Sequence, residues 1–304
     1  MHPLNGIPLS MLTCFAFVFG AVVGSFLNVV IARVPFQQSI VWPPSHCMAC
    51  GTPIKPFHNV PVLSWFWLRG RCRTCLAPFS IRYAGIEFLY GAVCALAVYR
   101  HGLSIPAARE ILMMGFLVPL TFMDLDWWVL PRELTFSGVA TGLVLAFVES
   151  WDVFQMRLLG AAVGWAGLML VGYISERIVG REALGQGDPP LLGLIGAFLG
   201  PQALLPVLLL SSVQGVAVGI PMVLLRRRKE AKEPKPEEPT VAAAAQPPPE
   251  PEPEPVAGEK NPADDDDNWT PDPTAVPFGP FLSLAGAELL YFTQLPQYLF
   301  PWPF

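Results

Sequence analysis

Charged side chains are scarce in this sequence of 304 residues, of which only 14% are Asp, Glu, Lys or Arg. Hydrophobic residues make up 53% of the chain, and the mean hydropathy is +0.46. Soluble globular domains carry about a quarter of charged residues, so this composition excludes that class and indicates an integral membrane protein. The sequence also lacks a glycine-rich loop between a strand and a helix, so no soluble type of cofactor-binding fold is visible.

The few charges are unevenly distributed. Residues 229–276 hold 13 of the 24 acidic residues but only four of the 19 basic ones, so the net charge of −5 arises in this one segment. A segment dominated by Pro, Glu, Ala and Asp cannot bury enough apolar surface to offset its ordering entropy. We expect a disordered acidic loop over 230–277, whose role the sequence does not indicate. The composition does not indicate nucleic-acid binding.

No ionised side chain occurs between residues 9 and 32, a stretch long enough to cross a bilayer. A secretory signal peptide fits poorly, because the basic segment that precedes the apolar part of such peptides is missing. Gly20, Gly24 and Asn28 recur at every fourth residue, which predicts a face that packs closely against another helix. Seven further apolar segments follow, over residues 84–99, 107–123, 134–150, 155–174, 189–200, 202–225 and 278–299.

These segments predict an all-α polytopic membrane protein with about eight transmembrane helices. The loops over 33–82, 124–133, 175–188 and 226–277 would then share one side of the membrane, and they hold 16 of the 19 basic residues. Because basic residues concentrate in cytoplasmic loops, we expect these four loops in the cytoplasm and both termini on the opposite side.

Four of the six cysteines form two C-x-x-C pairs, Cys47 with Cys50 and Cys72 with Cys75. Two pairs separated by 21 residues are typical of tetrahedral zinc, because each tight turn supplies two thiolates. Two disulfides are the alternative, which a cytoplasmic location argues against. Since four thiolates would saturate the metal, we predict a structural Zn²⁺ in a small cytoplasmic zinc-binding domain over 33–83.

Neither His46 nor His58 is expected to be a metal ligand, although His46, next to the first pair, could replace one thiolate. Cys14 and Cys94 lie in apolar runs, where a cysteine usually packs in a core, so we expect packing roles for both.

Two aspartates lie at the ends of apolar segments, where a carboxylate is costly and therefore indicates a functional site. Asp188 follows a G-x-G segment and precedes an apolar run, and Asp124 ends another run. The expected topology places both on the cytoplasmic side, so we predict that they meet and share one hydrolytic task. Asp126 is the rival of Asp124 for this role and is otherwise a surface carboxylate at the membrane interface.

The expected organisation has five parts. They are a first transmembrane helix (1–32), the zinc-binding domain (33–83), a membrane core that holds both aspartates (84–229), the acidic loop (230–277) and a last transmembrane helix with the C-terminus (278–304).

Several motifs follow one another in a fixed order outside residues 230–276. They are Gly24-Ser25-Phe26-Leu27-Asn28-Val29-Val30 with Arg33, the two cysteine pairs, Asn59-Val60-Pro61-Val62-Leu63-Ser64-Trp65, Arg69-Gly70-Arg71-Cys72, Arg82-Tyr83 with Glu87, Asp124 with Leu130-Pro131, Gly185-Gln186-Gly187-Asp188, Gly196-Ala197-Phe198-Leu199-Gly200 and Pro277-Phe278-Gly279-Pro280-Phe281. Together they resemble the type IV prepilin peptidases, the bifunctional leader peptidases and N-methyltransferases of type IV pilus and type II secretion systems.

The resemblance implies an aspartic endopeptidase of the bacterial inner membrane. Such an enzyme cuts prepilins or pseudopilins after the glycine that ends the leader, then methylates the new N-terminal residue with S-adenosylmethionine. The resemblance assigns catalysis to Asp124 and Asp188. Asp124 is chosen because the family's first aspartate lies seven residues before the proline of the Leu-Pro pair, which here is Pro131. One of two neighbouring carboxylates keeps a proton, so the ionised one can activate water while the other donates to the scissile carbonyl.

Two positions depart from the family pattern. Pro190 stands where many members have a lysine, and Arg132 stands where the Leu-Pro pair is usually followed by an aspartate. Because of these two changes, the sequence does not show which charged residue stabilises Asp188 or orients the substrate. Beyond membrane lipid and prepilin substrates no partner is implied, and the sequence does not indicate the substrate's identity, the residues that bind the methyl donor or the oligomeric state.

Two alternatives from other classes stay open. One is a related G-x-G-D protease without methyltransferase activity, although such relatives would not be expected to carry the cysteine-rich 33–82 segment. The other is a non-enzymatic membrane assembly factor or transporter with a zinc module, in which the aspartates conduct protons or pair with arginines.

Overall fold

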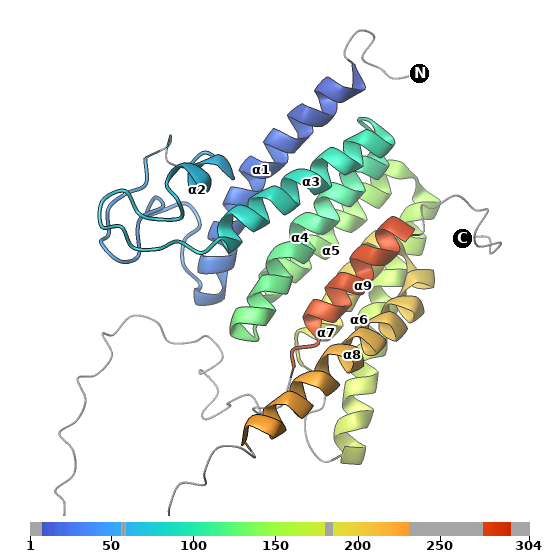
Figure 1. The fold of residues 1–304 in the computed structure, drawn as a ribbon. Coiled ribbons are helices and arrows are strands. Elements are labelled where there is room, and N and C mark those ends of the chain that lie inside the picture. The colour runs from blue at the N-terminus through green and yellow to red at the C-terminus, as the bar shows by residue number, and fades with distance from the viewer. Residues whose placement is uncertain (1–7, 56, 58, 180–184, 231–275, 293–304) are drawn as a thin grey trace, which may run out of the picture.

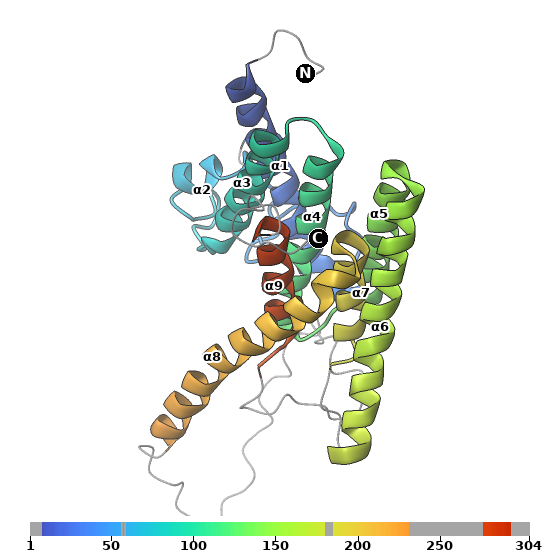
Figure 2. The same cartoon turned by 90° about the vertical axis from the view of Figure 1, so that its right-hand side faces the viewer.

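The computed structural model describes residues 8–55, 57, 59–179, 185–230 and 276–292. Within these ranges it contains helices and two isolated β-bridges but no strand. Figures 1 and 2 show the helices gathered into a bundle with α2 at its side. The helices are α1 (Leu9–Arg33), α2 (Leu63–Trp67), α3 (Arg82–His101), α4 (Ile105–Trp127), α5 (Arg132–Glu149), α6 (Trp151–Val179), α7 (Asp188–Leu199), α8 (Leu204–Glu230) and α9 (Gly279–Phe292), with short 3-10 turns at Val34–Phe36 and Pro201–Ala203.

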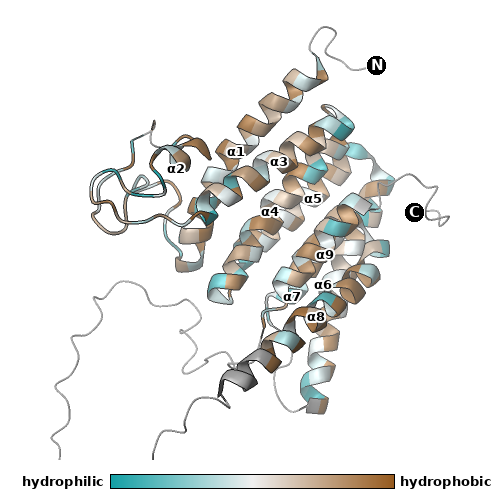
Figure 3. Cartoon of the chain, in the orientation of Figure 1, coloured by the Kyte–Doolittle hydropathy of each residue, from teal (hydrophilic) through white to brown (hydrophobic). Residues whose placement is uncertain are grey.

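Each of the eight predicted apolar segments overlaps one α-helix, and α2 lies in the cysteine-rich segment. Figure 3 shows hydrophobic residues along these helices and hydrophilic ones at helix ends and in the loop around α2. Four stretches are long and apolar enough to cross a membrane, Leu9–Phe36, Ile105–Trp127, Trp151–Ile178 and Pro201–Leu224.

Parts of the expected organisation lie outside the described residues. These parts are positions 231–275 of the predicted acidic loop, residues 1–7 and residues 293–304 of the last segment.

The predicted packing face of α1 is confirmed. A Cβ at Gly24 would lie 2.8 Å from Glu87 Cα on α3, so glycine lets the two helices approach closely. Gly20 meets α3 in the same way, and Asn28 Nδ2 donates a hydrogen bond of 3.1 Å to the carbonyl oxygen of Tyr83. This face therefore joins α1 to α3 along the bundle.

Helix α7 is the most enclosed helix that the structure describes, since its residues from Asp188 to Phe198 are all buried. Helix α6 packs along it through glycines, and a Cβ at Gly164 would lie 2.8 Å from the carbonyl oxygen of Leu192. Helices α4, α5 and α9 also contact α7, as Figure 2 shows from the side. With 12 residues, α7 is about 18 Å long and does not reach across a bilayer core of about 30 Å.

Candidate functional site

The structure brings the two predicted aspartates together at one end of the bundle. Asp124 lies in the last turn of α4 and Asp188 is the first residue of α7. Their side chains are close enough to interact electrostatically, and the residues are only 6% and 4% exposed. We call these two residues the dyad, and the end of the bundle where they lie the dyad end.

Three backbone segments converge on the dyad. A Cβ at Gly187 would lie 2.5 Å from Leu130 Cβ, so the turn before Asp188 packs directly on the loop that follows α4. A Cβ at Gly279, the first residue of α9, would collide with Asp124 Oδ2 and lie 3.2 Å from Leu130 Cδ1. Glycine is therefore required at both positions by the space available, and the start of α9 closes over Asp124.

One oxygen of the dyad is poorly hydrogen-bonded. Asp124 Oδ2 is buried without a well-formed hydrogen bond from the described residues, and the backbone of Gly279 is the polar group that lies against this carboxylate. A buried carboxylate oxygen without a partner is costly unless it carries a proton or meets water or a ligand. The arrangement therefore suits a carboxyl pair that shares one proton and takes up a water or a substrate carbonyl between its members.

Asp126 has a different environment. Arg82, the first residue of α3, makes a bidentate ion pair with its carboxylate, and the guanidinium also lies 4.8 Å from the ring centroid of Phe122. The Asp126 side chain is 26% exposed. An exposed acid held by two arginine nitrogens is a surface ion pair, as expected for a residue that is not part of the dyad.

The two departures from the family pattern also lie at the dyad end. Arg132 begins α5, and its Nη2 donates a hydrogen bond of 3.4 Å to Gln186 Oε1, in the turn that carries Asp188. Pro190 is buried in the first turn of α7, where a proline needs no hydrogen-bond donor. The arginine thus reaches the turn before Asp188 through an amide.

The four paired cysteines form a second cluster. Their Sγ atoms all lie within 4.8 Å of one another, and Cys47 Sγ is 3.7 Å from Cys75 Sγ. Four thiolates around Zn²⁺, with Zn–S bonds of about 2.3 Å, have sulfur–sulfur distances of about 3.8 Å. All six cysteines are free, so the alternative of two disulfides is wrong in this structure. The cluster fits a tetrahedral metal ion.

The two cysteine turns share one backbone pattern. Gly51 and Leu76, each directly after a pair, have positive φ values of +67° and +62°. The backbone N–H groups of Cys75 and Thr74 act on the Cys72 sulfur and lower the pKa of this thiol, whereas burial and the neighbouring thiols raise the pKa of Cys75. Backbone N–H groups directed at a sulfur favour the thiolate form that binds a metal.

The other candidates near the cysteines are separate from this cluster. His46 Nδ1 lies 3.1 Å from the carbonyl oxygen of Pro44, and the histidine is not among the clustered ligands. Cys94 is buried as predicted, whereas the packing role expected for Cys14 is wrong, because that residue is exposed on α1.

Sequence reasoning overlooked a buried acid at the far end of the bundle. The Glu110 side chain is fully buried, and its Oε1 lies 2.8 Å from His101 Nε2 and 3.4 Å from Arg100 Nη1. Arg100 also lies over the Tyr291 ring of α9, at 5.5 Å. A lone glutamate in an apolar segment was the signal that could have revealed this link between α3, α4 and α9.

Two family models match the chain. The bacterial peptidase A24 N-terminal domain matches residues 18–101, which include the four clustered cysteines, and the type IV leader peptidase family matches residues 111–220, which include the dyad.

Curated proteins from several bacteria are similar over most of the chain. A protein named prepilin leader peptidase/N-methyltransferase from Myxococcus xanthus is 39% identical over 298 residues, which cover 91% of this chain and 89% of that protein. Proteins of the same name from Aeromonas hydrophila and Neisseria gonorrhoeae are 36% and 33% identical, over 71% and 74% of this chain and 83% and 89% of theirs. No solved structure matches the chain.

Proposed function

Because the chain belongs to the prepilin leader peptidase/N-methyltransferase family, we propose that it removes the leader of type IV prepilins or pseudopilins after a glycine and methylates the new N-terminal residue. The observation that carries the peptidase activity is the buried pair of Asp124 and Asp188 at the meeting point of α4, α7 and α9. A pair of buried carboxylates suits hydrolysis better than a structural role, since neither forms an ion pair among the described residues.

The dyad would act as an aspartic protease. The ionised carboxylate removes a proton from a water molecule, and the resulting hydroxide adds to the scissile carbonyl carbon. The protonated carboxyl donates its hydrogen to the carbonyl oxygen, and the proton taken from water later passes to the leaving amine. Because the two groups titrate together, their protonation belongs to the pair. The poorly hydrogen-bonded Asp124 Oδ2 is a suitable place for the shared proton or the attacking water.

The short α7 explains how such a site could be recessed. Its length of about 18 Å leaves Asp188 below the membrane surface if the other end of α7 reaches the opposite interface. Irregular backbone at that depth is tolerated where it is buried in protein, and the Gly187 turn is covered by Leu130. An extended substrate segment would enter at this level.

The metal is assigned to the four clustered cysteines as a structural Zn²⁺. All four coordination positions would be filled by thiolates, so no position is left for a substrate or an activated water. The metal would supply a cross-link between the two cysteine turns, and no catalytic step is assigned to it.

The topology proposed for the chain has eight helices in the bacterial inner membrane. The dyad end, the zinc-binding domain and the acidic loop would face the cytoplasm, where the sequence concentrates its basic residues. The proposed zinc-binding domain covers residues 33–83, the membrane core residues 84–229 and the acidic loop residues 230–277.

The methyl donor implied by the family name is S-adenosylmethionine, which carries a sulfonium cation. The cavity beside the cysteine cluster is lined by three arginines and no acid. Those residues do not fit a cationic donor, so methyl transfer is proposed from family membership alone.

A single assay tests both activities. The purified full-length protein is incubated with a prepilin and S-adenosylmethionine, and mass spectrometry reads the N-terminus of the product. We expect cleavage after glycine and a mass increase of one methyl group. Asp124→Asn and Asp188→Asn should each reduce cleavage at least about a thousandfold, whereas Asp126→Asn serves as the control. Cleavage that persists in either dyad variant would exclude this mechanism, and cleavage without methylation would favour a related G-x-G-D protease.

A further inference from the structure

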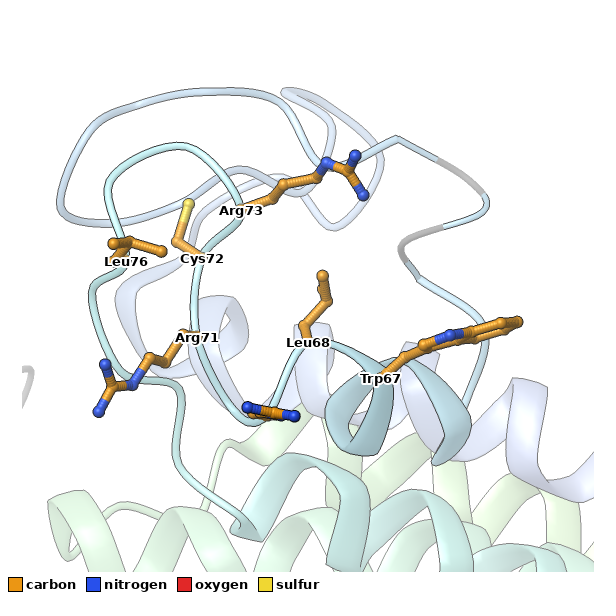
Figure 4. Close-up of a pocket in the computed structure, with 7 residues that line it drawn as sticks. Trp67, Leu68, Arg71, Cys72, Arg73 and Leu76 are labelled. Carbon is orange, nitrogen blue, oxygen red and sulfur yellow. The ribbon is translucent and has the colours of Figure 1, made fainter.

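A hollow of about 540 Å³ lies between α2 and the second cysteine turn. Figure 4 shows Leu68 projecting into it, with Arg73 extending above that leucine and Arg71 pointing outward from the loop. The residues that line it are Trp67, Leu68, Arg69, Arg71, Cys72, Arg73 and Leu76.

The charge of this hollow is positive and uncompensated. Three of its seven lining residues are arginines and none is acidic. Among the described residues, the side chains of Arg69, Arg71 and Arg73 make neither an ion pair nor a hydrogen bond. Guanidinium groups are the side chains best suited to bind phosphate oxygens, so the hollow is expected to attract a phosphate-bearing anion.

The surface beside the hollow is apolar. Two aromatic residues of the five-residue helix α2 are largely exposed, Trp67 by 80% and Phe66 by 63%. Leu63 and Leu76 are exposed as well. Aromatic side chains next to arginines are characteristic of protein surfaces at the boundary between lipid headgroups and acyl chains.

Helix α2 lies beside the bundle and is tied to α3 by a hydrogen bond. The backbone N–H of Val62, directly before α2, donates a hydrogen bond of 2.7 Å to Glu87 Oε2 on α3. Glu87 in turn packs on Gly24 of α1. Gly24 lies nine residues before Arg33, the last residue of α1, which corresponds to about 13 Å along the helix. Figures 1 and 2 both place α2 alongside α3. The hydrogen bond thus draws α2 against the flank of the bundle.

We propose that this hollow binds the headgroup of an anionic phospholipid from the surrounding membrane. The arginines contact the phosphate, and Phe66 and Trp67 enter the adjacent acyl region. A soluble anion or an acidic peptide would satisfy the arginines but would leave the two aromatic side chains in water. The lipid would hold the cysteine-rich segment against the membrane, beside the dyad end.

The test measures lipid binding to the purified full-length protein by native mass spectrometry in detergent. Phosphatidylglycerol is titrated as the anionic probe and phosphatidylcholine as the zwitterionic one. We expect one phosphatidylglycerol to be retained more tightly than phosphatidylcholine. Arg71→Gln and Arg73→Gln should each weaken that binding about fivefold, because a basic residue at a membrane surface contributes about that factor.

Arg177→Gln provides the matched control. Arg177 is an exposed arginine near the end of α6 that donates to Tyr173 Oη, so its loss removes the same charge without touching the hollow. Phosphatidylglycerol binding should remain within twofold of the unaltered protein. The metal content of each variant is measured in parallel, and Arg69→Gln, which lies further from the cysteines, replaces any variant that loses metal.

Four results would overturn the proposal. Two concern the lipid: equal binding of the two lipids, and unchanged phosphatidylglycerol binding in the arginine variants. The other two are displacement of the lipid by millimolar inorganic phosphate and displacement of the lipid by S-adenosylmethionine. Phosphate displacement would indicate a site for free anions, and S-adenosylmethionine displacement a site for the methyl donor. Prepilin cleavage in detergent is a separate readout, so the peptidase assignment stands or fails independently of this lipid site.

Discussion

The dyad end and the cysteine-rich segment are joined by the ion pair of Arg82 and Asp126 but are stabilised in different ways. At the dyad end, α7 is buried on all sides and glycines allow backbones to touch. Among the described residues between 37 and 81, by contrast, only Cys47, Gly70 and Cys72 are buried. A segment with so little core depends on cross-links, and here the cysteine cluster can supply one through a metal. One region is therefore positioned by packing, and we propose that the other is positioned by metal coordination.

The largest effect is expected from breaking the internal contacts of the bundle. Glu110→Ala removes the carboxylate that lies against His101 and Arg100 and leaves those groups beside an apolar core. We expect the free energy of unfolding to fall by about 3 kcal/mol. The measurement is the thermal unfolding midpoint in a fixed detergent.

The matched control is Glu149→Ala. Glu149 pairs with Arg109, and its side chain is 31% exposed, so its loss should cost about 1 kcal/mol or less. Equal shifts of the midpoint for the two variants would contradict the view that buried contacts hold the bundle.

Closing the space beside Asp124 should have the next largest effect. A Cβ in Gly279→Ala would collide with Asp124 Oδ2 and displace either α9 or the carboxylate. Because a misplacement of about 1 Å can cost a factor of about 100 in rate, we expect the kcat of prepilin cleavage to fall by about that factor. Metal content should not change.

Gly219→Ala on α8 is the control for this change, since a Cβ there would meet no atom within 4 Å. Its cleavage rate should stay within twofold. A Gly279→Ala variant with full activity would show that α9 does not shape the site.

Removing the metal tests whether the cysteine-rich segment depends on the cysteine cluster. With Cys50→Ser or a chelator, the segment between the cysteine pairs should become about tenfold more susceptible to added protease, because it has little core of its own. Limited proteolysis followed by mass spectrometry locates the cuts. The bundle should resist under the same conditions, and cuts that appear equally in α4 or α7 would show that the two regions are not independent.

The smallest effect is expected where the two regions are joined. Arg82 follows the cysteine-rich segment and pairs with Asp126 on α4, close in sequence to Asp124. Both side chains are partly exposed, so Asp126→Asn should lower stability by no more than about 1 kcal/mol and cleavage by less than about threefold. A complete loss of cleavage in Asp126→Asn would instead indicate that this residue, and not Asp124, belongs to the catalytic pair.

The parts of the site that were predictable depend on short-range patterns. The spacing of the cysteine pairs specified a common cluster, and apolar segments with basic loops placed Asp124 and Asp188 at one end. The contact of Gly279 with Asp124 was not predictable, because it arises only when α9 packs against α4 after a long intervening segment. The exposed Cys14 was misjudged for a related reason: hydrophobicity alone does not tell whether a face of a membrane helix meets protein or lipid.

The contact between Gly279 and Asp124 also sets an order of events during synthesis. A ribosome makes both aspartates and all four clustered cysteines, and then residues 231–275, before it reaches Gly279. A chain inserted only as far as α8 therefore lacks the backbone that closes over Asp124 Oδ2. Helix α9 is the last of the described helices to be synthesised, so the backbone that closes over Asp124 is added after every other described part of the dyad end.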